Sequence, residues 1–136
     1  MNETFEPLRG DEAVAAVRAV VVGIPPGAVL SYGDVAELAG LGTPRLAARI
    51  MASGKLGRGT PWWRVVRADG TLPDHLQITA RERYEREGTP LRDTRAHWAQ
   101  VDVRRARWAE PVQYSGGPAT SKNEPRGSNA RPVRRS

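Results

Sequence analysis

The sequence contains no cysteine. Disulfides, thiolate metal sites and a cysteine nucleophile are therefore excluded. The two histidines, His75 and His97, are too few and too far apart in sequence to indicate a metal cluster, and no cofactor is expected. No apolar run approaches the length of about 18 residues that a membrane span needs. The N-terminus also lacks the basic start and apolar core of a signal peptide, so a cytoplasmic protein without a membrane partner is expected.

Basic residues outnumber acidic ones, and many of them lie near the end of the chain. The 136 residues carry a formal net charge of +6. From Pro111 onward, five basic residues and one acidic residue give +4, which leaves +2 for the rest. A basic balance favours a polyanionic partner, although a charge of this size is weak evidence by itself.

The composition divides the chain into one domain, residues 1–110, and a basic tail, residues 111–136. The tail is rich in Gly, Pro, Ser, Asn and Arg and has few large apolar residues. Such a segment buries too little surface to offset its ordering entropy, so disorder is expected. We favour a solvated tail over the alternative of an arm that adds nonspecific attraction to phosphate.

The first helix is expected from about Asp11 to Val22. Asp11 is placed to cap it, and valines recur along one face. Gly23 and the run Pro25-Pro26-Gly27 stop the helix. A short extended piece is expected to follow.

The next two helices form the pattern of a helix-turn-helix. Ser31 and Asp34 match a capping box at the start of one helix. Glycines at positions 40 and 42 make the turn. Thr43, followed by proline, caps a third helix that extends to about Ser53. This helix is the expected recognition helix.

Beyond a glycine-containing loop, the pattern predicts a small wing. The segment from Trp62 to Arg67 is compatible with a strand, and the Asp-Gly pair at 69–70 indicates a turn. A further helix is expected from Thr79 to Glu87, capped by Thr79 and ended by Gly88. The fold class is therefore mainly α with a small β wing, a winged helix-turn-helix DNA-binding domain.

Two motifs carry a resemblance to a known family. Residues 24–36, which read IPPGAVLSYGDVA, resemble the motif that opens the DNA-binding half of O6-alkylguanine-DNA alkyltransferases. Residues 61–66, PWWRVV, and the Asp-Gly pair resemble the family's Pro-Cys-His-Arg-Val-Val segment and its following glycine. The resemblance covers about Val14 to Leu91. It implies binding of duplex DNA through the minor groove and flipping of an alkylated guanine.

The sequence departs from the family at the reactive position. Trp62 stands where the family has its acceptor cysteine, and Trp63 stands where it has the activating histidine. Indole cannot accept an alkyl group, because its nitrogen is only a donor and alkyl transfer needs an activated nucleophile. The sequence resembles the alkyltransferase-like subgroup, which has tryptophan at the cysteine position and mostly retains the histidine. The resemblance implies a non-enzymatic protein that flags the lesion for nucleotide excision repair proteins.

The resemblance also implies roles for residues around the third helix. Arg45 lies 17 positions before Trp62, the spacing of the family's arginine finger, which fills the gap left by the flipped base. Arg49 is the rival for this role and is otherwise assigned a phosphate contact. Ala47 and Ala48 permit close approach to the groove or serve core packing, and these two interpretations stay equal. The expected DNA-binding residues are Tyr32, Thr43, Arg45, Ala47, Ala48 and Arg49.

The expected lesion pocket comprises Tyr32, Trp62, Trp63 and Arg64. An extruded purine needs a flat apolar partner, and we assign this role to Trp62. Adjacent residues of a strand face opposite sides, so Trp63 is assigned to packing against the core. Residues 67–77 correspond to the family's lesion-binding loop, in which His75 is interpreted as a surface residue and not as a catalytic base.

Two rival functions remain at this point. One is a transcriptional regulator that reads sequence in the major groove as a dimer, although no dimerisation stripe is evident and a monomer is expected. The other is an enzyme with residual transfer or hydrolysis. The missing cysteine argues against transfer, and no nucleophile–base pair is visible for hydrolysis.

Overall fold

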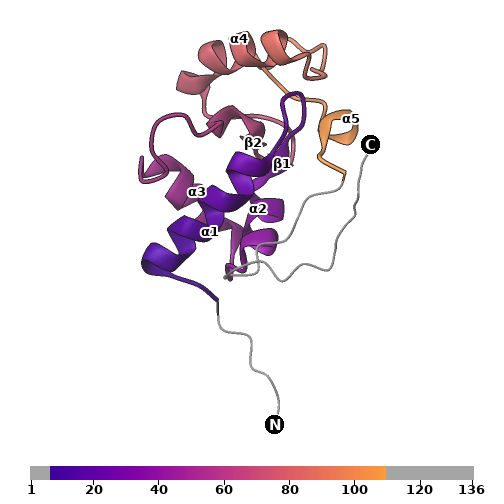
Figure 1. Ribbon diagram of the computed structural model, residues 1–136. Helices are drawn as coiled ribbons and strands as arrows, with labels where there is room; N and C mark the ends of the chain where they lie inside the picture. The colour runs from indigo at the N-terminus through magenta and orange to yellow at the C-terminus, as the bar shows by residue number, and fades with distance from the viewer. Residues whose placement is uncertain (1–6, 110–136) are drawn as a thin grey trace, which may run out of the picture.

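The computed structural model describes residues 7–109, so the tail predicted for residues 111–136 lies outside the described residues. Figure 1 shows three helices gathered at one end of the molecule, a helix at the other end, and a small sheet between them. The elements in chain order are α1 (Gly10–Gly23), β1 (Leu30–Ser31), α2 (Tyr32–Ala39), α3 (Pro44–Ala52), η1 (Trp62–Arg64), β2 (Val65–Val66), η2 (Asp74–Leu76), α4 (Gln77–Glu87) and α5 (Val103–Ala106), where η marks a 3-10 helix. The predicted mainly helical fold with a small sheet is confirmed. None of the described helices is long and apolar enough to cross a membrane.

Helix α1 buries Val17 and Val21 as predicted, but its cap was predicted wrongly. Val17 and Val21 are fully buried, and the helix ends at Gly23. The residue before the first turn is Arg9, and no side chain caps this end. Asp11 instead lies inside the first turn, where a negative charge still favours the positive end of the helix dipole.

The helix-turn-helix forms with the predicted caps. Ser31 Oγ accepts from Asp34 N at 3.0 Å, and Asp34 Oδ2 accepts from Ser31 N at 3.1 Å, which completes the capping box of α2. At the start of α3, Thr43 Oγ1 accepts from Arg45 N at 3.0 Å. The turn between the two helices begins at Gly40, as predicted.

The sheet differs from the predicted wing. Trp62–Arg64 forms a 3-10 turn, and only Val65–Val66 is a strand. This strand pairs in parallel with β1, in the register Leu30 to Val65 and Ser31 to Val66. The Asp-Gly turn does form, since Gly70 N donates to Arg67 O at 2.8 Å. Arg67 N also donates to Thr71 O at 2.9 Å across this turn, but within the described residues no strand pairs with β2 beyond it, and the sheet consists of β1 and β2. Gly70 O accepts from Val101 N at 2.9 Å.

Helix α4 begins earlier than predicted. It follows η2 directly and starts at Gln77, so Thr79 lies inside the helix and caps nothing. Ala80 and Tyr84 are buried, and Gly88 ends the helix as predicted. The short helix α5 was not predicted, since its segment has no clear apolar periodicity.

The two-stranded sheet separates two apolar clusters. Leu30 and Val65 belong to a cluster with α1, α2 and α3. Val29 and Val66 belong to a second cluster with α4 and the chain from Leu91 to Ala106. Neighbouring residues of a strand point to opposite faces of the sheet. Two neighbouring residues on each chain segment are therefore enough to place one side chain in each cluster. The second cluster therefore fixes η1 and β2 against α4.

Candidate functional site

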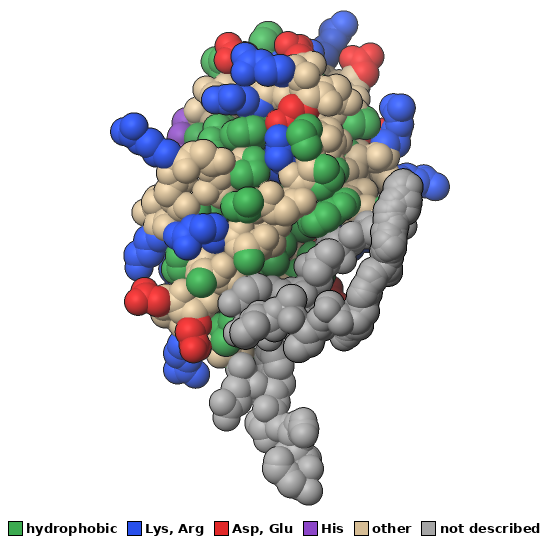
Figure 2. Space-filling model, viewed as in Figure 1, with side chains coloured by type: hydrophobic (Ala, Val, Ile, Leu, Met, Phe, Trp, Pro, Cys, Tyr) green, Lys and Arg blue, Asp and Glu red, His purple; other side chains and the backbone are tan. Residues whose placement is uncertain are grey.

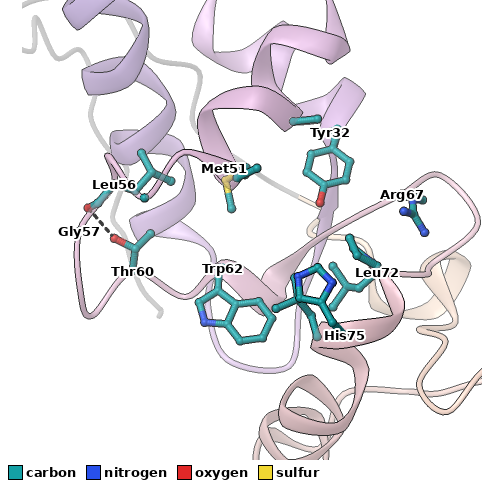
Figure 3. A pocket seen from close by; sticks show the side chains of 14 residues that line it. Tyr32, Met51, Leu56, Gly57, Thr60, Trp62, Arg67, Leu72 and His75 are labelled. Carbon is teal, nitrogen blue, oxygen red and sulfur yellow. Dashed lines mark hydrogen bonds between the residues drawn. The ribbon is translucent and has the colours of Figure 1, made fainter.

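A cavity of about 520 Å³ opens between α2, α3 and η1. Its volume falls within the range of about 300–1,000 Å³ that is typical of small-molecule sites. Figure 3 shows Met51, Trp62, Tyr32 and His75 around one opening. Its lining consists of Tyr32, Ala48, Met51, Ala52, Gly54, Leu56, Gly57, Thr60, Trp62, Arg67, Leu72, Pro73, His75 and Leu76. Most of these side chains are apolar, so the cavity favours a flat and largely apolar occupant.

Trp62 forms one wall of the cavity. It is the first residue of η1 and is half-buried. Its ring packs edge-on against Trp63, with ring centroids 5.6 Å apart and an angle of 88° between the planes. Figure 3 shows its indole reaching into the opening. The face of this ring is available to stack against a planar group.

Tyr32 supplies a polar group from α2. It is the first residue of that helix and is half-buried. Burial raises the pKa of the phenol, although nearby Arg67 partly opposes this effect. The hydroxyl therefore stays protonated near neutral pH and can donate a hydrogen bond into the cavity. His75, which was interpreted as a surface loop residue, is exposed and also lines the cavity.

Trp63 and Arg64 were grouped with the expected lesion pocket, with Trp63 assigned to packing, and neither of them lines the cavity. Trp63 Nε1 donates to Glu87 Oε2 at 2.9 Å, and the Arg83 guanidinium lies 4.8 Å from the centroid of its ring. Arg64 donates to both oxygens of Glu87 and, through Nη1, to Ile24 O at 2.7 Å. The 3-10 turn, instead of a strand, sends these side chains toward α4 and α1. Their contacts with Glu87 and Ile24 anchor η1 to the rest of the fold.

Glu87 is the centre of this support. Its carboxylate accepts from Trp63, from Arg64 and from Gly27 N at 3.2 Å. Burial by itself raises the pKa of this carboxyl, but the hydrogen bonds from Arg64, Gly27 and Trp63 outweigh burial and lower it. The ionised carboxylate thus connects the loop after α1, η1 and α4. Because Trp63 and Arg64 follow Trp62 in η1, this connection fixes the turn that carries Trp62.

The predicted DNA-binding residues of α3 lie in different environments. Arg45 and Arg49 are exposed, and within residues 7–109 their side chains have no ion pair or hydrogen bond to the protein. Ala48 is half-buried and lines the cavity. Ala47 is fully buried in the core, so its predicted contact with DNA is wrong and its packing role applies. Thr43 is exposed, and its hydroxyl oxygen is occupied by the helix cap.

The segment that carries α3 and much of the cavity contains no acidic residue. From Leu38 to Ala68 there is no Asp or Glu, whereas six residues are basic: Arg45, Arg49, Lys55, Arg58, Arg64 and Arg67. All of them except Arg64 are exposed. In Figure 2, hydrophobic side chains gather in the middle of the face shown, and Lys and Arg side chains lie around its edge together with some Asp and Glu side chains. Exposed cations on one segment attract a polyanion. No cluster of metal-binding side chains was found in the described chain.

Sequence reasoning missed several residues of the cavity. Met51 was placed on the third helix without a role, Leu56 was assigned only to the loop at residues 54–59, and Thr60 was assigned to no element. The helical spacing of Ala48 and Ala52 indicates a face of α3 with small side chains, and Met51 lies beside it. The loop residues carry no comparable sequence signal, because they reach the cavity only through the fold.

Comparison with known proteins gives consistent results. Residues 12–89 match the family described as 6-O-methylguanine DNA methyltransferase, DNA binding domain. Two proteins called DNA base-flipping protein, from Escherichia coli strain K12 and Shigella flexneri, are each 38% identical over 96 residues, or 65% of this chain and 68% of theirs.

Solved structures resemble the fold as well. Schizosaccharomyces pombe Atl1, in complex with damaged DNA containing O6-carboxymethylguanine, matches with a TM-score of 0.66 and 25% identity, over 76% of this chain and 100% of that chain. A variant of the Mycobacterium tuberculosis O6-methylguanine methyltransferase shares the fold at a TM-score of 0.51 and 24% identity, over 64% of this chain and 55% of that one.

Proposed function

The chain belongs to the family of the 6-O-methylguanine DNA methyltransferase DNA-binding domain, and we propose from this that it recognises O6-alkylated guanine in duplex DNA and holds the flipped base without repairing it. The cavity walled by Trp62 is the observation that carries this proposal. It combines a flat aromatic wall, an apolar lining and a tyrosine hydroxyl next to an exposed recognition helix. The relatives named for base flipping support the same conclusion.

DNA approaches the face of α3. Arg45 at the start of the helix enters the duplex from the minor groove, and its planar guanidinium donates to the cytosine that the flipped base leaves. Arg49 and the loop cations Lys55 and Arg58 contact phosphates. The absence of any carboxylate between Leu38 and Ala68 supports this orientation, because a carboxylate on this face would repel the phosphates.

Selection for the lesion follows from the energetics of flipping. Extruding a base costs a few kcal/mol, and less when an alkyl group has already weakened its pairing. Stacking of the flipped base on an aromatic side chain such as Trp62 stabilises the complex by about 1–3 kcal/mol. A weakly paired base is therefore the one that stays in the cavity.

No transfer follows, because the chain has no cysteine and Trp62 occupies the acceptor position. The alkylated base is not modified while it is bound. The lifetime of the complex is therefore set only by the rate at which the DNA dissociates. We propose that the persistent complex flags the lesion for nucleotide excision repair.

Competition binding tests the proposal. A labelled duplex with one O6-methylguanine is titrated against the same duplex with guanine at a fixed salt concentration. Trp62→Ala is compared with Trp98→Ala, which removes an exposed tryptophan outside the cavity. Arg45→Ala is compared with Arg86→Ala, which removes an exposed arginine on α4.

The wild-type protein is expected to prefer the lesion, and the alkyl group is expected to remain on the DNA after long incubation. The preference is lost in Trp62→Ala and Arg45→Ala and kept in the two controls. Equal affinity of the wild-type protein for both duplexes contradicts lesion recognition and favours a regulator that binds DNA without damage specificity.

A further inference from the structure

Arg18 on α1 binds the loop that forms one wall of the cavity. Its Nη2 donates to Lys55 O at 2.8 Å, and its Nε donates to Leu56 O at 3.2 Å. These contacts join residues that lie 37 and 38 positions apart in the sequence. Arg18 itself does not line the cavity, so it can act there only through the loop.

The loop, residues 53–60, is built to be deformable. Gly54, Gly57 and Gly59 have φ values of +80°, +87° and +86°, a region that other residues seldom adopt. Backbone hydrogen bonds within it are few, with Gly57 N donating to Gly54 O at 3.3 Å. A segment rich in glycine loses much conformational freedom on ordering, so it needs anchors from outside.

The anchors meet at one carbonyl group. Leu56 O accepts from Arg18 and also from Thr60 Oγ1 at 2.9 Å, and the Leu56 side chain is buried. Thr60 is followed by Pro61 and then Trp62, so the path from Arg18 leads directly to the tryptophan wall. Figure 3 shows Thr60 and Leu56 joined on the side of the cavity next to Trp62. Leu56, Gly57 and Thr60 line the cavity themselves.

We propose that Arg18 is a positioning residue for the lesion cavity. It holds the loop so that the wall beside Trp62 is preformed, and it thereby strengthens binding of the flipped base over binding of intact duplex. The effect of Arg18 on DNA binding rests on the proposed function. Its effect on the loop rests only on the hydrogen bonds described above. Preorganising a wall lowers the ordering cost that binding otherwise pays.

Arg81 offers a matched control. Its Nη1 also donates to a backbone carbonyl, Trp98 O at 2.6 Å, but Trp98 does not line the cavity, whereas the Leu56 held by Arg18 does. Arg18→Ala and Arg81→Ala each remove one positive charge. The first also removes hydrogen bonds to two backbone carbonyls, and the second removes one such bond together with the ion pair to Glu85. Arg18→Lys keeps the charge and restores a donor to one of the two carbonyls.

Two measurements separate the parts of the proposal. Hydrogen exchange of the free proteins reports the Lys55 and Gly57 amides, which donate to Ser53 Oγ and Gly54 O. The ratio of affinities for O6-methylguanine duplex and guanine duplex reports selection. In Arg18→Ala the loop amides exchange at least severalfold faster and the ratio falls about tenfold, which corresponds to about 1.4 kcal/mol. Arg18→Lys recovers part of the exchange protection and part of the affinity ratio. Arg81→Ala changes neither the exchange of the loop amides nor the affinity ratio.

Unchanged exchange in Arg18→Ala overturns the positioning role whatever the DNA result. Faster exchange with an unchanged affinity ratio also overturns it, because the loop then does not set selection. If the wild-type protein shows no preference for the lesion while exchange in Arg18→Ala rises, the proposed function fails and the anchoring of the loop stands.

Discussion

Gly70→Ala is expected to destabilise the domain severely and to disturb the cavity. Gly70 has a φ of +88°, and a Cβ built there overlaps the carbonyl oxygen of Val101 and lies 3.0 Å from its carbonyl carbon. Gly70 O also accepts from Val101 N at 2.9 Å. The side chain can therefore fit only if the turn moves away from the segment around Val101.

Three effects add up in this variant. A left-handed conformation costs a residue with a Cβ about 1–2 kcal/mol. Overpacking against buried backbone costs about 1–3 kcal/mol, and losing the Val101 hydrogen bond costs about 0.5–1.5 kcal/mol. The combined loss of about 3–6 kcal/mol is a large share of the total stability of a small domain, about 5–15 kcal/mol.

Gly88→Ala isolates the conformational cost, so its difference from Gly70→Ala gives the steric cost. Gly88 has a φ of +75°, and a Cβ built there meets nothing within 4 Å. This variant is expected to lose only the conformational energy of about 1–2 kcal/mol. Both variants are measured by urea unfolding and by the preference for O6-methylguanine duplex. Because the Gly70 turn leads into the cavity residues Leu72 and His75, the preference falls in Gly70→Ala and stays in Gly88→Ala. Equal stability losses in the two variants refute the steric argument.

Three further predictions concern caps, pH and salt. Ser31→Ala removes the side-chain cap of α2 and is expected to cost about 1 kcal/mol in thermal or urea unfolding. The pKa of Asp34 lies below its ordinary value because Arg107 donates to it, and the pKa of Glu87 is lowered because its hydrogen bonds outweigh burial. Both groups therefore contribute stability that is complete above their unfolded pKa values of about 4 and is lost as the pH falls through the lower folded values. Urea midpoints measured from pH 6 to 2 should fall less steeply in Asp34→Asn and Glu87→Gln than in the wild-type protein, and parallel curves would contradict this. Arg49→Ala should weaken binding to damaged and intact duplex equally and reduce the slope of log affinity against log salt by about 1, whereas a selective loss on damaged DNA would show that Arg49 acts at the base and not at a phosphate.

Local signals in the sequence predicted the helix-turn-helix well. The capping box of Ser31 with Asp34, the Thr43-Pro44 start of α3 and the Gly88 stop of α4 all lie where expected. Each of these depends on residues within a few positions of one another, so the sequence carries the whole signal. Thr79 failed as a cap because the chain enters α4 directly from η2, and this depends on the preceding loop.

The environment of the site residues was harder to predict. Trp62 was expected at a pocket and lines the cavity, but the argument from strand alternation was wrong, since η1 is a 3-10 turn. Ala47 was equally compatible with groove contact and with packing, and only burial decides between them. Arg64 was expected near the lesion and instead pairs with Glu87, 23 positions away.

The sequence by itself determined the chemistry that this protein lacks and the local elements it forms. With no cysteine, and with tryptophan at the position that aligns with the family's acceptor, transfer of an alkyl group to a cysteine of this chain is excluded without any structure. Only the tertiary structure decided which side chains share the cavity, that Glu87 supports η1 and that Arg18 reaches the loop across from α1. Such contacts join distant parts of the chain through packing that depends on all elements at once, whereas composition and caps depend on residue type and short spacing alone.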